Sequence, residues 1–223
     1  KGFERMYGSV EDYCVLALLP SYLEREGSSL IDMIADFIAK SKNEKSGFFL
    51  KNEAELIDIL QKTAQNKQKT LLFGVSFALL DLAEQHQLDL SHAIIMETGG
   101  MKGRREELTR TELHRIYCEA FNVEHIHSEY GMTELLSQAY SQGEGLFETP
   151  PWMKVMIRDV NDPFAYVPPH KTGGINVIDL ANVHGCSFIA TQDLGRKNEQ
   201  GQFEVLGRFD NSDLRGCNLL IAE

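Results

Sequence analysis

Residues 70–97 read TLLFGVSFALLDLAEQHQLDLSHAIIME, and this stretch decides the fold class. Two short and continuously apolar runs, TLLFGVS and HAIIME, enclose the segment FALLDLAEQHQ, in which apolar residues recur at helical spacing. Runs of that length and composition are typical of strands that are buried on both faces, and the helical segment between them indicates a crossover connection. The stretch therefore predicts a βαβ unit with two parallel strands.

The same alternation extends from the N-terminus to about residue 140. Further strands are expected at YCVLALLP, GFFL and VEHIHS, and further helices at residues 28–40, 52–64 and 109–121. Ser29 and Asn52 are the expected N-caps of the first two of these helices. Thr109 and Glu112 form a capping box for the third. The expected fold class is α/β, with a mainly parallel sheet that is flanked by helices and binds ligands beyond the carboxyl ends of its strands.

The character of the sequence changes after Pro150. Short alternating runs such as MKVMIRDV, GGINVIDL and FEVLGRFD are separated by turn-forming segments such as NDP and HKTGG, which predicts a β-rich, barrel-like subdomain. We therefore expect an α/β part over residues 1–150, the β-rich subdomain over residues 151–207, and a hinge-like tail over residues 208–223 that carries Cys217.

Composition excludes several classes of protein. The 223 residues are 43% hydrophobic and carry a formal net charge of −11, which fits a globular protein and offers no basic face for nucleic acid. The longest apolar runs are far shorter than the roughly 20 residues of a transmembrane helix, and no signal-peptide pattern opens the chain. The cysteines are dispersed and include no CxxC pair, so we expect a reducing compartment and a cytoplasmic location.

Two motifs follow predicted strands. METGGMKG places Gly99 and Gly100 after a strand, where the missing Cβ atoms allow a flat ring or a phosphate to approach the backbone. SEYGMTE is expected to end a strand and to begin a helix. Tyr130 has a ring that suits stacking on a base, Thr133 lies where a hydroxyl and helix N–H groups meet a phosphate, and Glu134 suits Mg²⁺. Taken singly, each motif is better explained by an ordinary turn, because short motifs often match by accident.

Two residues of the β-rich part suit a ribose. Asp193 ends the run SFIATQD and offers a carboxylate to vicinal hydroxyls, while the alternative is a surface aspartate in a β-turn. Arg208 lies in FEVLGRFD and offers a rigid fork of donors beside Asp210, while the alternative is a surface ion pair.

Taken together and in this order, METGG, YGMTE, DLGR and GRFD resemble the motifs of the adenylate-forming superfamily of acyl- and aryl-CoA ligases. The resemblance runs from about Leu72 to Gly216 and departs from the superfamily at Gln192, where glycine is usual. It implies the large domain of an adenylate-forming enzyme, ATP and Mg²⁺ as cofactors, Thr133 and Glu134 as catalytic residues, and Glu134 as the metal ligand. The implied cofactor-binding residues are Gly99, Gly100, Met101, Glu129, Tyr130, Gly131, Met132, Thr133, Asp193 and Arg208.

Two absences refine the resemblance. The Ser/Thr/Gly-rich phosphate loop of the superfamily is not found in the sequence, so we expect a segment that precedes Lys1. Only thirteen residues follow Asp210, at the position where CoA ligases carry a lid domain. A short end with a cysteine resembles the acyl-protein synthetases, the LuxE-like component of fatty-acid reductase systems. This implies that a fatty or other carboxylic acid is adenylated and passed to Cys217, which is then also catalytic, with an acyl reductase or acyltransferase as a partner protein.

Two alternatives to this function stay open. One is a fragment of an acyl- or aryl-CoA ligase of the phenylacetate-CoA ligase type. The other is a nucleotide- or partner-binding module without chemistry, because the phosphate loop lies outside the sequence. Trp152 and Phe77 could line the substrate side, although side-chain packing is the more usual explanation of a lone tryptophan and of apolar residues at this spacing.

Overall fold

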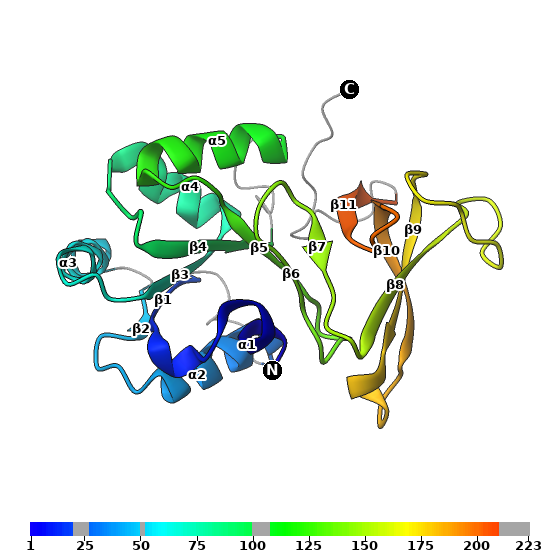
Figure 1. Ribbon diagram of the computed structural model, residues 1–223, viewed down its shortest axis with the longest axis horizontal. Coiled ribbons are helices and arrows are strands. Elements are labelled where there is room, and N and C mark those ends of the chain that lie inside the picture. The colour runs from blue at the N-terminus through cyan, green and yellow to red at the C-terminus, as the bar shows by residue number, and fades with distance from the viewer. Residues whose placement is uncertain (20–26, 50–51, 100–107, 210–223) are drawn as a thin grey trace.

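The structure is a computed structural model that describes residues 1–19, 27–49, 52–99 and 108–209 (Figure 1). The described helices are α1 (Gly2–Tyr7), α2 (Ser29–Ser41), α3 (Glu53–Gln65), α4 (Ser76–Gln85) and α5 (Arg110–Phe121), with short 3-10 turns η1 (Val10–Asp12) and η2 (Leu180–Asn182). The strands are β1 (Cys14–Leu18), β2 (Gly47–Phe48), β3 (Thr70–Val75), β4 (Ala93–Thr98), β5 (His127–Tyr130), β6 (Ala139–Ser141), β7 (Phe147–Glu148), β8 (Met153–Arg158), β9 (Gly173–Asp179), β10 (Phe188–Lys197) and β11 (Phe203–Arg208).

These strands form one sheet in the order β2-β1-β3-β4-β5-β6-β7-β11-β10-β9-β8. Neighbours from β2 to β5 run parallel. From β5 onward the neighbours run antiparallel. The predicted fold class is confirmed, because a parallel α/β part is followed by a β-rich part. The β-rich part continues the same sheet, since Phe147 of β7 pairs with Phe203 of β11.

Helices cover both faces of the parallel strands, as the unbroken apolar sequence of those strands requires. α4 and α5 lie together over one face, and α1 and α2 lie over the other (Figure 1). One hydrophobic core between these layers includes Leu16, Phe73 and Tyr117. A second core in the β-rich part includes Tyr130 and Phe203.

Local signals set the first residues of α5 and α2. The Thr109 hydroxyl accepts the N–H of Glu112, and the Glu112 carboxylate accepts the N–H of Thr109, so the predicted capping box of α5 is confirmed. The N-cap of α2 is Ser28, whose hydroxyl accepts the N–H of Ile31. The predicted cap at Ser29 is therefore wrong by one residue, because two adjacent serines offer the same cap chemistry and the register decides between them.

Residues 131–138 form turns, and the helix predicted to begin within YGMTE is not formed. The chain returns instead as β6, antiparallel to β5. The buried Asp179 carboxylate accepts the N–H groups of Leu136 and Ser137, each at 2.9 Å, and the Ser137 hydroxyl at 2.7 Å. The backbone N–H groups that a helix would place in its own hydrogen bonds are thus bonded to a side chain of β9 instead. The prediction was wrong because this partner lies 43 positions from Leu136 in the sequence.

Candidate active site

The candidate site lies where the parallel strands β4 and β5 end. Gly99 directly follows β4 and has a φ of 74°, a left-handed conformation that favours glycine. Tyr130 is the last residue of β5, the neighbour of β4 in the sheet. The two motifs are thus adjacent at the sheet edge where α/β proteins bind ligands. Gly100, Met101 and Cys217 lie outside the described residues.

Asp193 connects this edge to the β-rich part. The Tyr130 hydroxyl donates to Asp193 Oδ2 at 2.8 Å, and Arg208 Nε lies 3.6 Å from Asp193 Oδ1. Asp193 and Arg208 are directly opposite each other on β10 and β11. The structure therefore brings together three residues that the sequence separates, and we call Tyr130, Asp193 and Arg208 the Asp193 cluster.

The Asp193 carboxyl is held in a mixed electrostatic environment. Burial raises its pKa above the ordinary value, and the hydrogen bond from Tyr130 and the charge of Arg208 act in the opposite direction. The charge of Glu134 raises the same pKa further, which places Glu134 within electrostatic reach of the cluster. A cation or a set of hydroxyl donors at this point would relieve the excess of negative charge.

The Tyr130 ring lies in the second core, 4% exposed. It packs edge-on against Phe203 and Phe147, with centroid distances of 5.4 and 6.0 Å. Its burial leaves the hydroxyl as the group that reaches the site. The Tyr130 hydroxyl thus contacts Asp193 while its ring packs in the core, and the base-stacking role expected from the sequence stays a prediction.

Gln192 supports Arg208. Its Oε1 atom accepts a hydrogen bond from Arg208 Nη2 at 2.9 Å, so the residue that departs from the superfamily pattern orients the guanidinium. The pairing of β10 with β11 shifts register between Leu194 and Gly195. Such irregularities re-aim neighbouring side chains, and this one follows directly on Asp193.

The remaining residues of YGMTE lie in the turns after β5. Thr133 and Glu134 are exposed, and Gly131 and Met132 are partly buried. The Glu134 carbonyl accepts the Asn182 side-chain amide at 2.8 Å, which fixes the backbone of the turn while the Glu134 carboxylate stays exposed. Thr133 and Glu134 are therefore accessible to a phosphate and a cation, but no helix N-terminus stands behind Thr133.

Glu129 lies on the opposite face of β5 from Tyr130. Its Oε2 atom accepts the Thr98 hydroxyl at 2.5 Å, and its Oε1 atom lies so close to Gly131 that a Cβ there would overlap it. Burial raises the pKa of Glu129 to about 7, although the Thr98 hydrogen bond limits the rise. The carboxyl is therefore only partly ionised at neutral pH.

Replacing Glu129 by Gln is expected to remove a pH dependence of stability. The folded chain holds a proton on Glu129 up to about pH 7, whereas the unfolded chain loses it near 4.5. The stabilisation is therefore complete below 4.5 and lost as the pH rises through 7, by up to about 3 kcal/mol. Relative to the unchanged protein, Glu129→Gln should gain stability between pH 5 and pH 8 in urea unfolding. A Glu119→Gln control, at an exposed position, should show no such gain, and an equal response of both variants would contradict the assignment.

Sequence reasoning missed a buried polar cluster behind the site. Glu97 is 4% exposed. Its Oε1 atom accepts hydrogen bonds from His114 Nε2 at 2.9 Å and from the Ser128 hydroxyl at 3.1 Å. Its Oε2 atom accepts a hydrogen bond from the Ser76 hydroxyl at 3.3 Å. Burial acts to raise the pKa of Glu97, but the charge and hydrogen bond of His114, the charge of Arg110 and the Ser128 hydrogen bond lower it below the ordinary value. The signal was a carboxylate at the end of the apolar run HAIIME. We call Glu97, His114, Ser76 and Ser128 the Glu97 cluster.

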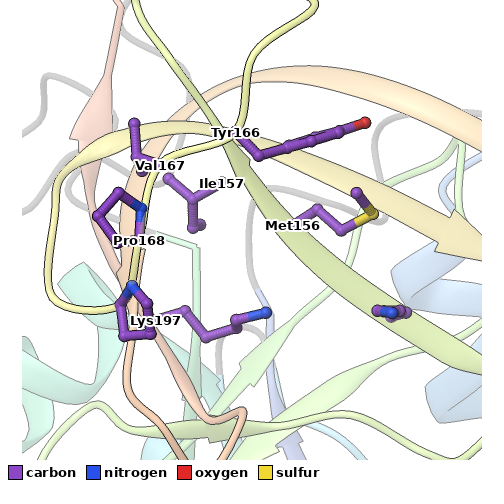
Figure 2. Close-up of a pocket in the computed structure, with 8 residues that line it drawn as sticks. Met156, Ile157, Tyr166, Val167, Pro168 and Lys197 are labelled. Carbon is purple, nitrogen blue, oxygen red and sulfur yellow. The ribbon is translucent and has the colours of Figure 1, made fainter.

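Two cavities lie away from the Asp193 cluster. One, of about 230 Å³, lies beside β8, where Tyr166 and Lys197 are among its lining residues (Figure 2). The other, of about 480 Å³, adjoins the turns after β5 and is lined in part by Leu136, Ser137 and Trp152. Trp152 Nε1 donates to the Ser137 hydroxyl at 2.9 Å, so this tryptophan joins the cavity wall to the turn.

Phe77 is buried in the first core, 3% exposed, and lines neither cavity. Within residues 1–19, 27–49, 52–99 and 108–209, no group of three or more His, Cys, Asp or Glu side chains is arranged to hold a metal ion. Over the same residues, no helix has the length and apolar character needed to cross a bilayer.

Comparison with known proteins gives matches in structure alone. No protein-family model matches the chain, and no curated protein does. Among solved structures, ATP-bound MatB from Rhodopseudomonas palustris has a TM-score of 0.64 and 18% identity over 92% of this chain and 42% of its own. O-succinylbenzoate coenzyme A synthetase (MenE) from Bacillus subtilis, in complex with ATP and magnesium ion, has a TM-score of 0.58 and 20% identity over 92% of this chain and 43% of its own.

McyG A-PCP, complexed with phenylalanyl-adenylate, has a TM-score of 0.67 and 15% identity over 93% of this chain and 42% of its own. The chain therefore has the fold of adenylate-forming ligases. It spans a little over two fifths of the length of these structures.

Proposed function

We propose that this chain belongs to an enzyme that activates a carboxylic acid with ATP and Mg²⁺ as an acyl-adenylate and then passes the acyl group to Cys217. The observation that carries the proposal is the Asp193 cluster. Tyr130 and Asp193 are 63 residues apart in the sequence, yet their side chains are hydrogen bonded at the edge where β5 ends, and Arg208 joins them there. The shared fold with ATP-bound ligases supports the same reading.

Each residue has a role in this proposal. Asp193 and Arg208 hold the ribose hydroxyls, because a carboxylate accepts and a guanidinium donates hydrogen bonds in a fixed geometry. The Tyr130 hydroxyl orients Asp193. Thr133 contacts the phosphates and Glu134 holds Mg²⁺. Gly99 lets the adenine approach the backbone, because it has no Cβ, and the adjacent Gly100 and Met101 are proposed as further cofactor-binding residues.

The first step joins the acid to the nucleotide. An oxygen of the substrate carboxylate attacks the α-phosphorus of ATP, the bond to the β-phosphate oxygen breaks, and pyrophosphate leaves. Mg²⁺ held by Glu134 would neutralise the charge that develops on the phosphates, so that no strong base would be needed. The cavity beside Leu136 and Trp152 adjoins the turn that carries Thr133 and Glu134, which supports it as the place of the acid.

The second step moves the acyl group. The Cys217 thiolate attacks the acyl carbon, and the bond from that carbon to the phosphate oxygen of the adenylate breaks. AMP leaves, and the acyl group stays on Cys217 as a thioester. An acyl reductase or acyltransferase would then accept the acyl group. The alternative acceptor is coenzyme A, which is favoured by the structural similarity to a coenzyme A synthetase.

Replacing Cys217 by Ser tests the acceptor. With labelled fatty acid and ATP, the unchanged protein should carry hydroxylamine-sensitive label, and Cys217→Ser should lose nearly all of it while ATP–pyrophosphate exchange persists. Cys186→Ser is the matched control, because Cys186 is an exposed cysteine outside the Asp193 cluster, and it should keep the label. Unchanged labelling of Cys217→Ser, or acylation of coenzyme A by both variants, would favour the ligase. Nucleotide binding without any exchange would favour a binding module.

A further inference from the structure

The Glu97 cluster joins four elements to one carboxylate. Ser76 begins α4, Glu97 lies near the end of β4, His114 lies on α5 and Ser128 lies on β5. The three partners donate to the Glu97 oxygens at 2.9 to 3.3 Å. The carboxyl ends of β4 and β5 are therefore fixed relative to the two helices that cover this face.

The core could be stable without the Glu97 cluster. Apolar side chains of similar volume commonly stabilise a core as well as a buried polar or charged pair does, and such pairs are better attested as devices that fix one arrangement of elements. The hydrogen-bonded pair of Glu97 and His114 lies at the functional edge of the sheet. Glu97 lies two residues before Gly99, and the Ser76 hydroxyl is also 3.4 Å from the Gly99 carbonyl oxygen. Ser128 lies two residues before Tyr130, so both side chains face the same side of β5.

The same helix also contacts β11. Arg110 lies one turn before His114 on α5, and its Nη2 atom donates to the Val205 carbonyl at 3.1 Å. Its guanidinium lies over the Phe147 ring, 5.7 Å from the centroid. β11 ends at Arg208, so α5 connects the Glu97 cluster on one side with the strand of the Asp193 cluster on the other.

We propose that Glu97 and His114 are a positioning pair for the nucleotide site. By holding α5 against the ends of β4 and β5, the pair sets the distance between Gly99, Tyr130 and the β11 residue Arg208, and with it the affinity for ATP. The inference rests on the proposed function, because the geometry that it explains is that of the proposed nucleotide site. Both side chains are largely buried behind the strand ends, so in this proposal they act through the residues that contact the nucleotide.

The test is a double-mutant cycle on ATP affinity, measured by calorimetry with the unfolding midpoint recorded for each variant. Glu97→Gln keeps the shape and an acceptor but removes the charge, and His114→Gln keeps a donor. Each single variant should raise the Kd for ATP about tenfold or more. The double variant should raise the Kd by no more than about a further threefold, because both substitutions remove the same contact between Glu97 and His114. Glu119→Gln on α5, which breaks an exposed pair with Arg115, should leave the Kd within twofold.

Each outcome decides between the explanations. A lower unfolding midpoint with an unchanged Kd in both single variants would reduce the pair to a structural role and overturn the proposal. Multiplying effects in the double variant would show that the two residues act separately, which overturns it as well. If the unchanged protein fails to bind ATP, the proposed function falls and this inference falls with it. If one single variant does not fold, the Kd of the other decides.

Discussion

Replacing Asp193 by Ala is expected to weaken the binding of ATP by roughly 100-fold. The Asp193 carboxylate is buried, is oriented by the Tyr130 hydroxyl at 2.8 Å, and lies beside Arg208. Hydrogen bonds from two ribose hydroxyls to a charged acceptor of this kind contribute about 3 kcal/mol together, and that energy is lost in the variant. The measurement is the Kd for ATP by isothermal titration.

Two further variants separate this effect from a general loss of structure. Asp193→Asn keeps the shape and one acceptor for Tyr130, so it should lose about tenfold in affinity. Glu199→Ala changes an exposed carboxylate in the connection between β10 and β11 and should bind ATP as the unchanged protein does. A folded Asp193→Ala protein with unchanged affinity would remove Asp193 from the site.

Replacing Asp179 by Ala is expected to lower the free energy of unfolding by about 3 kcal/mol. Asp179 is fully buried and accepts the N–H groups of Leu136, Ser137 and Ala181 as well as the Ser137 hydroxyl. Without the carboxylate these donors lose their partner, and some of them stay away from water. Asp179→Asn keeps one acceptor oxygen and should lose less than half as much. Urea unfolding measures both.

Asp179→Ala is also expected to change the fluorescence of Trp152. Trp152 is the single tryptophan of the chain and donates to Ser137, whose position Asp179 fixes. The fluorescence of folded Asp179→Ala should therefore shift at urea concentrations well below the main transition. Asp162→Ala, which changes an exposed carboxylate outside these turns, should leave the fluorescence unchanged. Identical spectra for Asp179→Ala and the unchanged protein would contradict the role given to Asp179.

The layout of the parallel part was predictable because its signals are local. Continuous apolar runs such as TLLFGVS permit little other than a buried strand, and β3 is buried along its whole length. Thr109 and Glu112 form their cap within three residues, and the capping box was confirmed. The resemblance also implied that Tyr130, Asp193 and Arg208 share one cofactor site, and the structure brings their side chains together.

Apart from the N-cap of α2, which was misplaced by one residue, the features that sequence reasoning missed depend on distant partners. The expected helix after Glu134 is replaced by turns, because Asp179 satisfies the backbone donors of Leu136 and Ser137. The Tyr130 ring is directed into a core by Phe203 and Phe147, which lie on strands later in the chain. No local pattern encodes such partners.

The arrangement of the Glu97 cluster was hidden for the same reason. Ser76 and Ser128 are separated by 21 and 31 residues from Glu97, and only the folded sheet brings them to one carboxylate. The carboxylate within an apolar run was visible in the sequence, but its partners were not. Gln192 is a related case, because its contact with Arg208 requires the pairing of β10 with β11.

The most direct measurement of the central claim is the structure of the protein in complex with a stable acyl-adenylate mimic. The account predicts that the two ribose hydroxyls lie within hydrogen-bonding distance of the Asp193 carboxylate and Arg208, with the adenine beside Gly99 and the phosphate mimic near Thr133. A mimic bound elsewhere, or a ribose without contact to Asp193 and Arg208, would contradict it.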